Sequence, residues 1–128
     1  MHELLKKVYY HDTDAGGVVY YANYLKYFEE GRSEYMLARG INIKALAEES
    51  ILFVVARVEI DYKAPARYGD VLKIISEVNR VKNVTLEFSQ QAKKEGNVLV
   101  SAATKLVCID GNFKPHAMPL EIIESLKK

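Results

Sequence analysis

The stretch from His11 to Asn23 combines two carboxylates, two adjacent glycines and several tyrosines just before a predicted helix. This combination suits chemistry on an electrophilic carbonyl group. Gly16 and Gly17 permit positive φ and let the backbone approach a ligand closely. Unpaired N–H groups at the helix start, near Tyr21, can stabilise an oxyanion. A carboxylate facing them, such as Asp14, could activate a water molecule as a general base or attack the carbonyl carbon itself.

Nearby polar residues have simpler interpretations. An aspartate before glycine is commonly a turn residue or a helix cap; this alternative also applies to Asp14, and it is our interpretation of Asp12. His11 could be a base, but a lone histidine at a strand end is typical of a polar loop. Cys108 lies in an apolar run and is predicted to be a buried thiol. Phosphate loops, dinucleotide fingerprints, serine elbows and metal-binding His or Cys pairs are absent from the sequence, so we expect neither a metal nor a cofactor.

The elements that must position this stretch are predicted from the period of the apolar residues. We expect a first strand over Leu4–Tyr10, a long amphipathic helix over Ala22–Arg39 that is capped by Gly40, and a short helix over 43–49 that is capped by Asn42. Four strands are expected to follow, and then a terminal helix over Pro119–Lys128. The four strands are Phe53–Tyr62, Val71–Lys82, Val84–Lys93 and Val98–Ile109. Hairpin-length connections predict an α+β fold, with an antiparallel sheet of five to six strands around one long central helix. In Arg57–Tyr62, Val58 and Ile60 alternate with charged residues, so the sheet's other face is expected to be polar or reserved for a partner.

Length and charge narrow the class of protein. The 128 residues predict one domain over 1–128, large enough for its own core. The formal net charge of +1 gives no global field for a nucleic acid. The first residues lack the apolar stretch of a signal peptide, and no segment is apolar enough for stable membrane insertion. With one cysteine, the composition favours a cytoplasmic protein.

The segment Val8-Tyr9-Tyr10-His11-Asp12-Thr13-Asp14-Ala15-Gly16-Gly17-Val18-Val19-Tyr20-Tyr21-Ala22-Asn23-Tyr24 resembles the 4-hydroxybenzoyl-CoA thioesterase family and the related acyl-CoA thioesterases of bacterial Tol-Pal operons. The resemblance continues through Phe28-Glu29, Arg32 and the loop Pro65–Asp70. It implies a hot-dog fold and an acyl-CoA thioesterase activity. Many Tol-Pal-type enzymes have histidine where this chain has Tyr21, and the 4-hydroxybenzoyl enzymes typically have proline where it has Ala15, so the acyl group stays open between aliphatic and aromatic.

The resemblance also implies roles for individual residues. The second aspartate of the Asp-x-Asp-x-x-Gly run, Asp14, is the family's catalytic carboxylate, and the oxyanion donor is the backbone N–H that corresponds to Tyr21. Gly16, Gly17, Tyr20 and Asn23 are expected to contact the substrate around these two groups. The CoA phosphates are expected to meet basic residues, for which Arg67, Arg80 and Lys82 are candidates, with solvated surface charges as the alternative.

Relatives of this kind form homodimers or homotetramers by joining sheets edge to edge, with each active site at the dimer interface, and we expect the same here. Two other functions remain to be weighed. An acyl-thioester dehydratase of the same fold needs a histidine on or before the helix, and none lies between Asp12 and Glu49. A non-catalytic acyl-thioester-binding or interaction module keeps the fold without turnover, which the intact Asp14 argues against.

Overall fold

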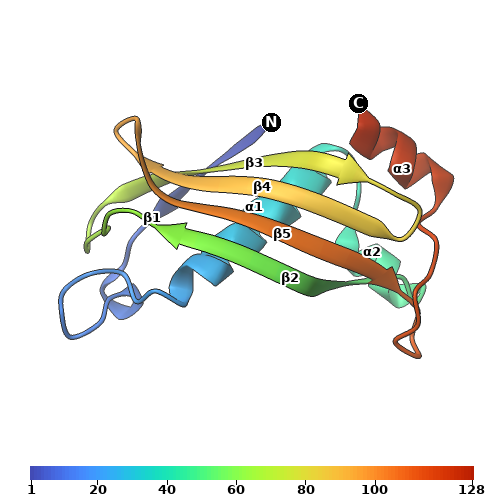
Figure 1. The fold of residues 1–128 in the computed structure, drawn as a ribbon, viewed down its shortest axis with the longest axis horizontal. Coiled ribbons are helices and arrows are strands. Elements are labelled where there is room, and N and C mark those ends of the chain that lie inside the picture. Colours follow the sequence, from blue (N-terminus) through green and yellow to red (C-terminus); the bar gives the residue numbers. More distant parts are fainter.

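The computed structural model describes residues 1–128 and contains one five-stranded antiparallel sheet. Its strands lie in the order β1-β3-β4-β5-β2, with β1 and β2 at the two edges (Figure 1). The bounds are His2–Lys7 for β1, Leu52–Tyr62 for β2, Val71–Val81 for β3, Thr85–Lys94 for β4 and Asn97–Ile109 for β5. The predicted four consecutive strands after the helix are confirmed, and the sheet has five strands in all.

One long helix, α1 (Asn23–Ala38), crosses a single face of this sheet diagonally, as Figure 1 shows. Two shorter helices, α2 (Ile43–Glu48) and α3 (Leu120–Lys127), lie at the end of the sheet where α1 finishes. Gly40 ends α1 with φ of +75°, and Ile41 N–H donates to Met36 O at 2.9 Å. This is the left-handed glycine cap that the sequence predicts. None of the helices is both long and apolar enough to cross a membrane.

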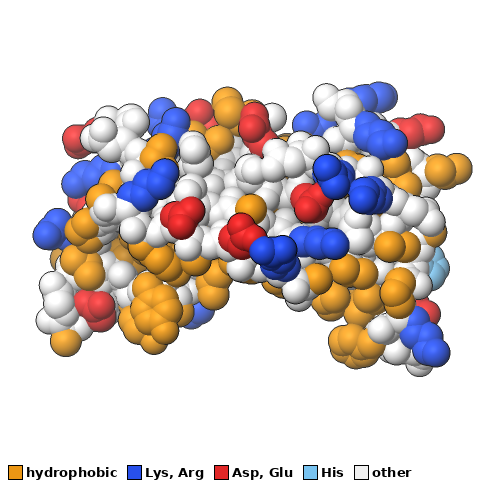
Figure 2. Space-filling view, in the orientation of Figure 1, with side chains coloured by type: hydrophobic (Ala, Val, Ile, Leu, Met, Phe, Trp, Pro, Cys, Tyr) orange, Lys and Arg blue, Asp and Glu red, His pale blue; other side chains and the backbone are white.

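The two faces of the sheet differ because strand side chains alternate. On β2, Val58 and Ile60 face α1, since they pair with the buried Thr104 and Ala102 of β5. The residues between them point away from the helix, and Figure 2 shows charged side chains across this outer face. Apolar side chains gather instead along the lower margin in that view, on the β2 side. The predicted amphipathic sheet is confirmed, and only its helix-facing side is buried.

The helix lies unusually close to the sheet at Gly31. A Cβ atom built there would be 2.8 Å from Ile74 Cγ2 and 2.9 Å from Ser76 Oγ. Beneath this glycine, Gln90 is 2% exposed; its Nε2 donates to Phe28 O at 2.8 Å and to Ser76 Oγ at 2.9 Å. A buried amide is stabilised only when it is hydrogen-bonded. Gln90 therefore fastens the middle of α1 to the sheet, and Gly31 leaves the room that this contact needs.

The first strand is shorter than predicted, ending at Lys7 instead of Tyr10. Val8 N–H donates to Asp70 O at 2.8 Å and leaves the β1–β3 ladder. Tyr9 N–H then donates to Asp12 Oδ2 at 2.9 Å, which turns the chain into a 3₁₀ helix, η1 (Tyr10–Asp12). The apolar residues there suggested a strand, but this local side-chain bond to the backbone prevails over β-propensity.

Candidate active site

Asp14 lies in a narrow loop that leads from η1 to α1. Its N–H donates to Val18 O at 2.9 Å, and a bridge between Thr13 and Val19 closes the base of the loop. The exposed Asp14 carboxylate accepts one hydrogen bond, from Gly16 N–H to Oδ1 at 2.8 Å. The other oxygen, Oδ2, has no partner within the chain. The carboxylate is thus held by one oxygen while the second is free to act on a ligand.

The glycines of this loop have different conformations. Gly17 has φ of +79°, as expected of a residue chosen for the left-handed region. Gly16 does not take positive φ, so that part of the expectation is wrong. A Cβ on Gly16 would be 3.2 Å from Asp14 Oδ1, so its glycine identity leaves space for the carboxylate that its own N–H binds.

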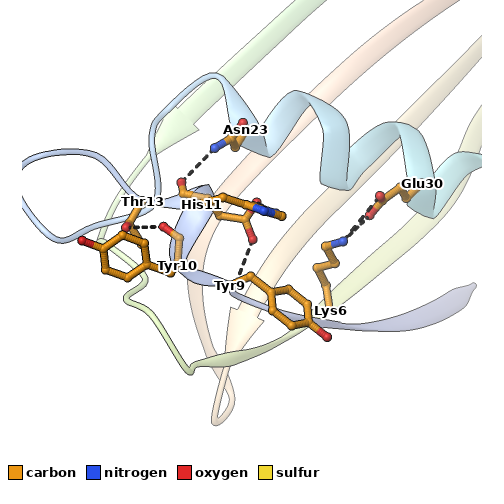
Figure 3. Close-up of polar contacts among 8 residues, drawn as sticks. Lys6, Tyr9, Tyr10, His11, Thr13, Asn23 and Glu30 are labelled. Carbon is orange, nitrogen blue, oxygen red and sulfur yellow. Dashed lines mark hydrogen bonds and ion pairs between the residues drawn. The ribbon is translucent and has the colours of Figure 1, made fainter.

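Asp12 and Asn23 hold the loop against the start of α1. Asp12 is buried and accepts from Tyr9 N–H, and its Oδ1 is 3.3 Å from His11 Nε2. The Asn23 amide points back to η1 and donates to Asp12 O at 2.8 Å (Figure 3). The turn-residue interpretation of Asp12 is confirmed. Asn23, predicted to contact the substrate, is engaged by its side chain in joining two structural elements.

Figure 3 also shows a connection between β1 and α1. Lys6 of β1 reaches Glu30 of α1, with 3.1 Å between Lys6 Nζ and Glu30 Oε1. Lys6 Nζ is also 5.4 Å from the centroid of the buried Tyr27 ring. Burial raises the pKa of the Tyr27 phenol, and the charge of Asp12 raises it further. These contacts fix the position of α1 relative to η1 and thereby the position of the helix start.

The start of α1 presents a free backbone donor. Tyr20 N–H donates to Asp12 O at 2.9 Å and Asn23 N–H to Tyr20 O at 2.8 Å, but the N–H of Tyr21 donates to no group of the chain. Tyr21 precedes Ala22, the N-cap residue of α1, so its N–H lies just outside the first helical turn, at the positive end of the helix dipole. Tyr21 N–H can therefore bind an oxygen that becomes negatively charged.

Tyrosine rings surround this donor. The rings of Tyr20 and Tyr21 are 4.9 Å apart between centroids, and Tyr62 of β2 is 6.1 Å from Tyr21 and donates its hydroxyl to Tyr21 O at 3.0 Å. The pKa of the Tyr20 phenol is raised, first by its hydrogen bond with Tyr21 and, to a smaller extent, by the negative charge of Asp14. Tyr20, Tyr21 and Asp14 thus share one corner of the molecule.

The three predicted phosphate-binding residues do not lie together. Arg67 belongs to the loop before β3 and bridges Val18 in the Asp14 loop. Asp70 stabilises that loop by accepting from Arg67 N–H at 2.8 Å and from Lys94 Nζ at 3.0 Å. Arg80 is at the other end of β3, about 30 Å further along a strand of this length. Within one chain, Arg80 and the adjoining Lys82 are remote from Asp14.

A groove between α1 and β2, which apolar periodicity does not indicate, is a further feature of the structure. The groove is a hollow of about 600 Å³ that includes Leu25, Phe28, Val55 and Val58 in its walls and Thr104 at its base. It begins one helical turn after Tyr21. Asp14 does not line this groove, and the side of its loop formed by residues 14–17 is exposed in a single chain. Cys108, by contrast, is fully buried as predicted, and burial raises the pKa of its thiol.

Comparisons with known proteins agree with this architecture. Residues 16–101 match the family model described as "Thioesterase superfamily". The chain is 43% identical over 118 residues to the acyl-CoA thioesterase YbgC of Haemophilus influenzae, covering 91% of this chain and 87% of that protein. A probable thioesterase from Bartonella henselae is 34% identical with a TM-score of 0.89, covering 92% and 98% of the two chains. A hypothetical protein from Aquifex aeolicus gives a TM-score of 0.93 at 28% identity, with 98% and 99% covered.

Proposed function

Because this chain belongs to the thioesterase superfamily and has its hot-dog fold, we propose that it hydrolyses acyl-CoA thioesters to a free acid and CoA, with Asp14 as the catalytic carboxylate. The observation that carries this proposal is the pairing of a half-free carboxylate with an unused helix-start donor. Asp14 Oδ2 and Tyr21 N–H have no partner in the chain, and both belong to one short segment.

The oxygen of the thioester carbonyl would lie against Tyr21 N–H. As a nucleophile adds to the carbonyl carbon, the electron pair of the C=O bond moves onto that oxygen and makes it an oxyanion. A fixed N–H at a helix start stabilises this charge more than it stabilises the neutral carbonyl, and this difference lowers the barrier. Collapse of the intermediate then expels CoA as a thiolate.

Asp14 can supply the nucleophile in two ways. As a general base, Oδ2 accepts a proton from a water molecule while the water oxygen bonds to the carbonyl carbon. As a nucleophile, Oδ2 bonds to that carbon itself, and the mixed anhydride formed after CoA departs is hydrolysed by water. The Gly16 N–H on Oδ1 supports both routes because it fixes the carboxylate without occupying the second oxygen.

A second subunit would complete the site. Strand β2 pairs with β5 along one edge only, and its eleven residues include the half-exposed Val55 and Tyr62. A long exposed edge strand with apolar side chains readily pairs with a strand of another chain. We expect two copies to join their β2 edges as a homodimer, with tetramers as pairs of such dimers, and a partner surface to cover the open Asp14 loop.

The same arrangement gives the phosphate candidates a role. A two-fold axis at the β2 edges would place the α1 start of one chain toward the far end of the sheet of the other, the end that carries Arg80 and Lys82. Arg67 would serve from the same chain as Asp14, since its loop is bridged to the Asp14 loop. Guanidinium and ammonium groups at the mouth of the site match the charge of the CoA phosphates.

The competing function is an acyl-thioester-binding module without turnover. Free CoA thiol released from a panel of aliphatic and aromatic acyl-CoAs, measured beside the binding of the same compounds by calorimetry, separates the two. The proposal predicts turnover of at least one group of thioesters. Binding without thiol release from any member of the panel would establish the binding module instead.

A further inference from the structure

The groove between α1 and β2 ends at two charged residues. Arg32 and Glu29 line the large hollow of about 600 Å³ and also a smaller apolar hollow of about 150 Å³ that continues along the helix. These two side chains therefore stand between the two spaces. Lys26 and Glu30 also line the large hollow, but Glu29 and Arg32 are the charged residues that line both spaces.

Arg32 has more donors than partners. A guanidinium carries five N–H donors, and the structure gives Arg32 one hydrogen bond, from Nη1 to Gln90 Oε1 at 3.1 Å. None of the five ion pairs in the structure includes it. Its burial lowers the pKa of the guanidinium, an effect that the nearby charge of Glu29 partly opposes. Gln90, itself fixed by Phe28 O and Ser76, sets the direction of the guanidinium.

Glu29 supplies the opposite chemistry. Its Oε1 accepts the hydroxyl of Ser33 at 2.8 Å, which leaves Oε2 without a partner in the chain. The end of the groove thus offers unused donors on Arg32 and an unused acceptor on Glu29. A hydroxyl group satisfies both, since it accepts one hydrogen bond and donates one. A methyl group leaves both unsatisfied, and a carboxylate can pair with Arg32 but is repelled by Glu29 and leaves that acceptor unsatisfied.

We propose that Arg32 and Glu29 determine the acyl specificity of the site, and that they select an acyl group with a hydroxyl at its far end. This inference rests on the proposed thioesterase function and identifies its substrate class. Nine residues separate Asn23 from Arg32, about 14 Å along the helix axis. A straight chain of medium length spans this distance, whereas a single-ring aromatic acyl group is too short.

The test compares matched thioesters on one enzyme. Octanoyl-, decanoyl- and dodecanoyl-CoA are each prepared with a methyl, a hydroxyl or a carboxylate at the terminal carbon, and kcat/KM is measured for all nine. The wild type is expected to prefer the hydroxyl form at one chain length by about tenfold or more, because the methyl analogue displaces water from the half-buried Arg32 and leaves its unused donors unpaired.

Two variants assign the preference to the charged pair. Arg32→Met is expected to remove the preference for hydroxyl over methyl, and Glu29→Gln to raise the rate with the carboxylate form relative to the hydroxyl form. Arg57→Met is the matched control, since Arg57 is an exposed arginine on the outer face, paired with Glu59, and should keep the wild-type ratios. Ratios within one variant cancel losses from partial unfolding, and Arg32→Lys shows whether charge alone suffices.

The outcomes separate this inference from the function on which it rests. In one outcome, the wild type hydrolyses the panel, Asp14→Asn abolishes this activity, and the methyl and hydroxyl forms react at equal rates at every length. This outcome would overturn the proposed specificity of Arg32 and Glu29 and leave the thioesterase function intact. An unchanged hydroxyl preference in Arg32→Met would do the same. If the wild type hydrolyses none of these thioesters and no shorter aliphatic or aromatic acyl-CoA, the proposed function fails and the inference with it.

Discussion

Replacement of Gly31 by alanine should destabilise this protein, although a glycine-to-alanine change in an exposed helix usually stabilises that helix. Alanine is favoured over glycine by about 1 kcal/mol in a helix interior. At Gly31 the new methyl group would lie 2.8 Å from Ile74 Cγ2, 2.9 Å from Ser76 Oγ and 3.0 Å from Gln90 Nε2. Overpacking of a well-filled core costs about 1–3 kcal/mol. The contacts come from two different strands, so no single side chain can move to relieve them.

The structure adds a second cost. Lifting α1 from the sheet would lengthen the hydrogen bond from Gln90 to Phe28 O and leave a buried amide poorly paired. Complete loss of the partner of a buried amide costs about 1–3 kcal/mol. The net expectation is a loss of about 1–3 kcal/mol, the helix propensity gain being outweighed. The assay is urea unfolding at one fixed protein concentration, because association would change the midpoint.

Glu34→Ala is the matched control on the exposed side of α1 and should change the free energy of unfolding by less than about 0.5 kcal/mol. A midpoint for Gly31→Ala equal to or above that of the wild type, with the same slope, would refute the close approach of helix and sheet on which the reasoning depends.

Three further predictions concern other parts of the chain. Tyr21→Phe should keep most of the activity, because the proposed donor is the backbone N–H; a loss as large as that of Asp14→Asn in the thiol-release assay would implicate the phenol. Burial opposes ionisation of Asp70, but the Arg67 N–H and Lys94 outweigh it and lower the pKa of this carboxyl group. The ionised carboxylate therefore stabilises the fold above about pH 4, its ordinary pKa, and this contribution is lost as the pH falls through the lower folded pKa. Asp70→Asn should therefore lower the urea midpoint by more at pH 7 than at pH 2.5, and equal losses at both would contradict this. Val58→Lys, which places a charge on the α1-facing side of the edge strand β2, should weaken self-association in sedimentation equilibrium, and an unchanged dissociation constant would exclude that side of the edge as the interface.

The periodic parts of the fold could be predicted from the sequence because each element follows one rule throughout. The 3.6-residue period and Gly40 bound α1 to within a residue at each end, and the turn Glu95-Gly96, with positive φ at both residues, closes the β4–β5 hairpin as its composition indicates. The end of β1 could not be predicted in this way. It depends on the Asp12 carboxylate binding Tyr9 N–H, a contact that apolar periodicity does not encode.

The candidate site was found from residue types, but its surroundings depend on tertiary contacts. Asp14 and the helix start could be singled out because a carboxylate, glycines and a helix start occur within one short segment. Arg32 and Gln90 are 58 residues apart, so nothing in their local sequence shows that they meet. The mid-helix Gly31 was the available signal, since a glycine in that position commonly marks a close approach to another element.

The most direct test of the central claim, that the Asp14 carboxylate drives thioester hydrolysis, is the rate of CoA thiol release by wild type, Asp14→Asn and Asp61→Asn at saturating substrate. Asp61 is an exposed aspartate on β2 without a hydrogen bond or ion pair, so its variant controls for the loss of one negative charge. The account predicts that Asp14→Asn lowers kcat by about 10²- to 10⁴-fold, with an unchanged urea midpoint and oligomeric state, while Asp61→Asn retains wild-type turnover. Equal turnover by Asp14→Asn and Asp61→Asn would contradict it.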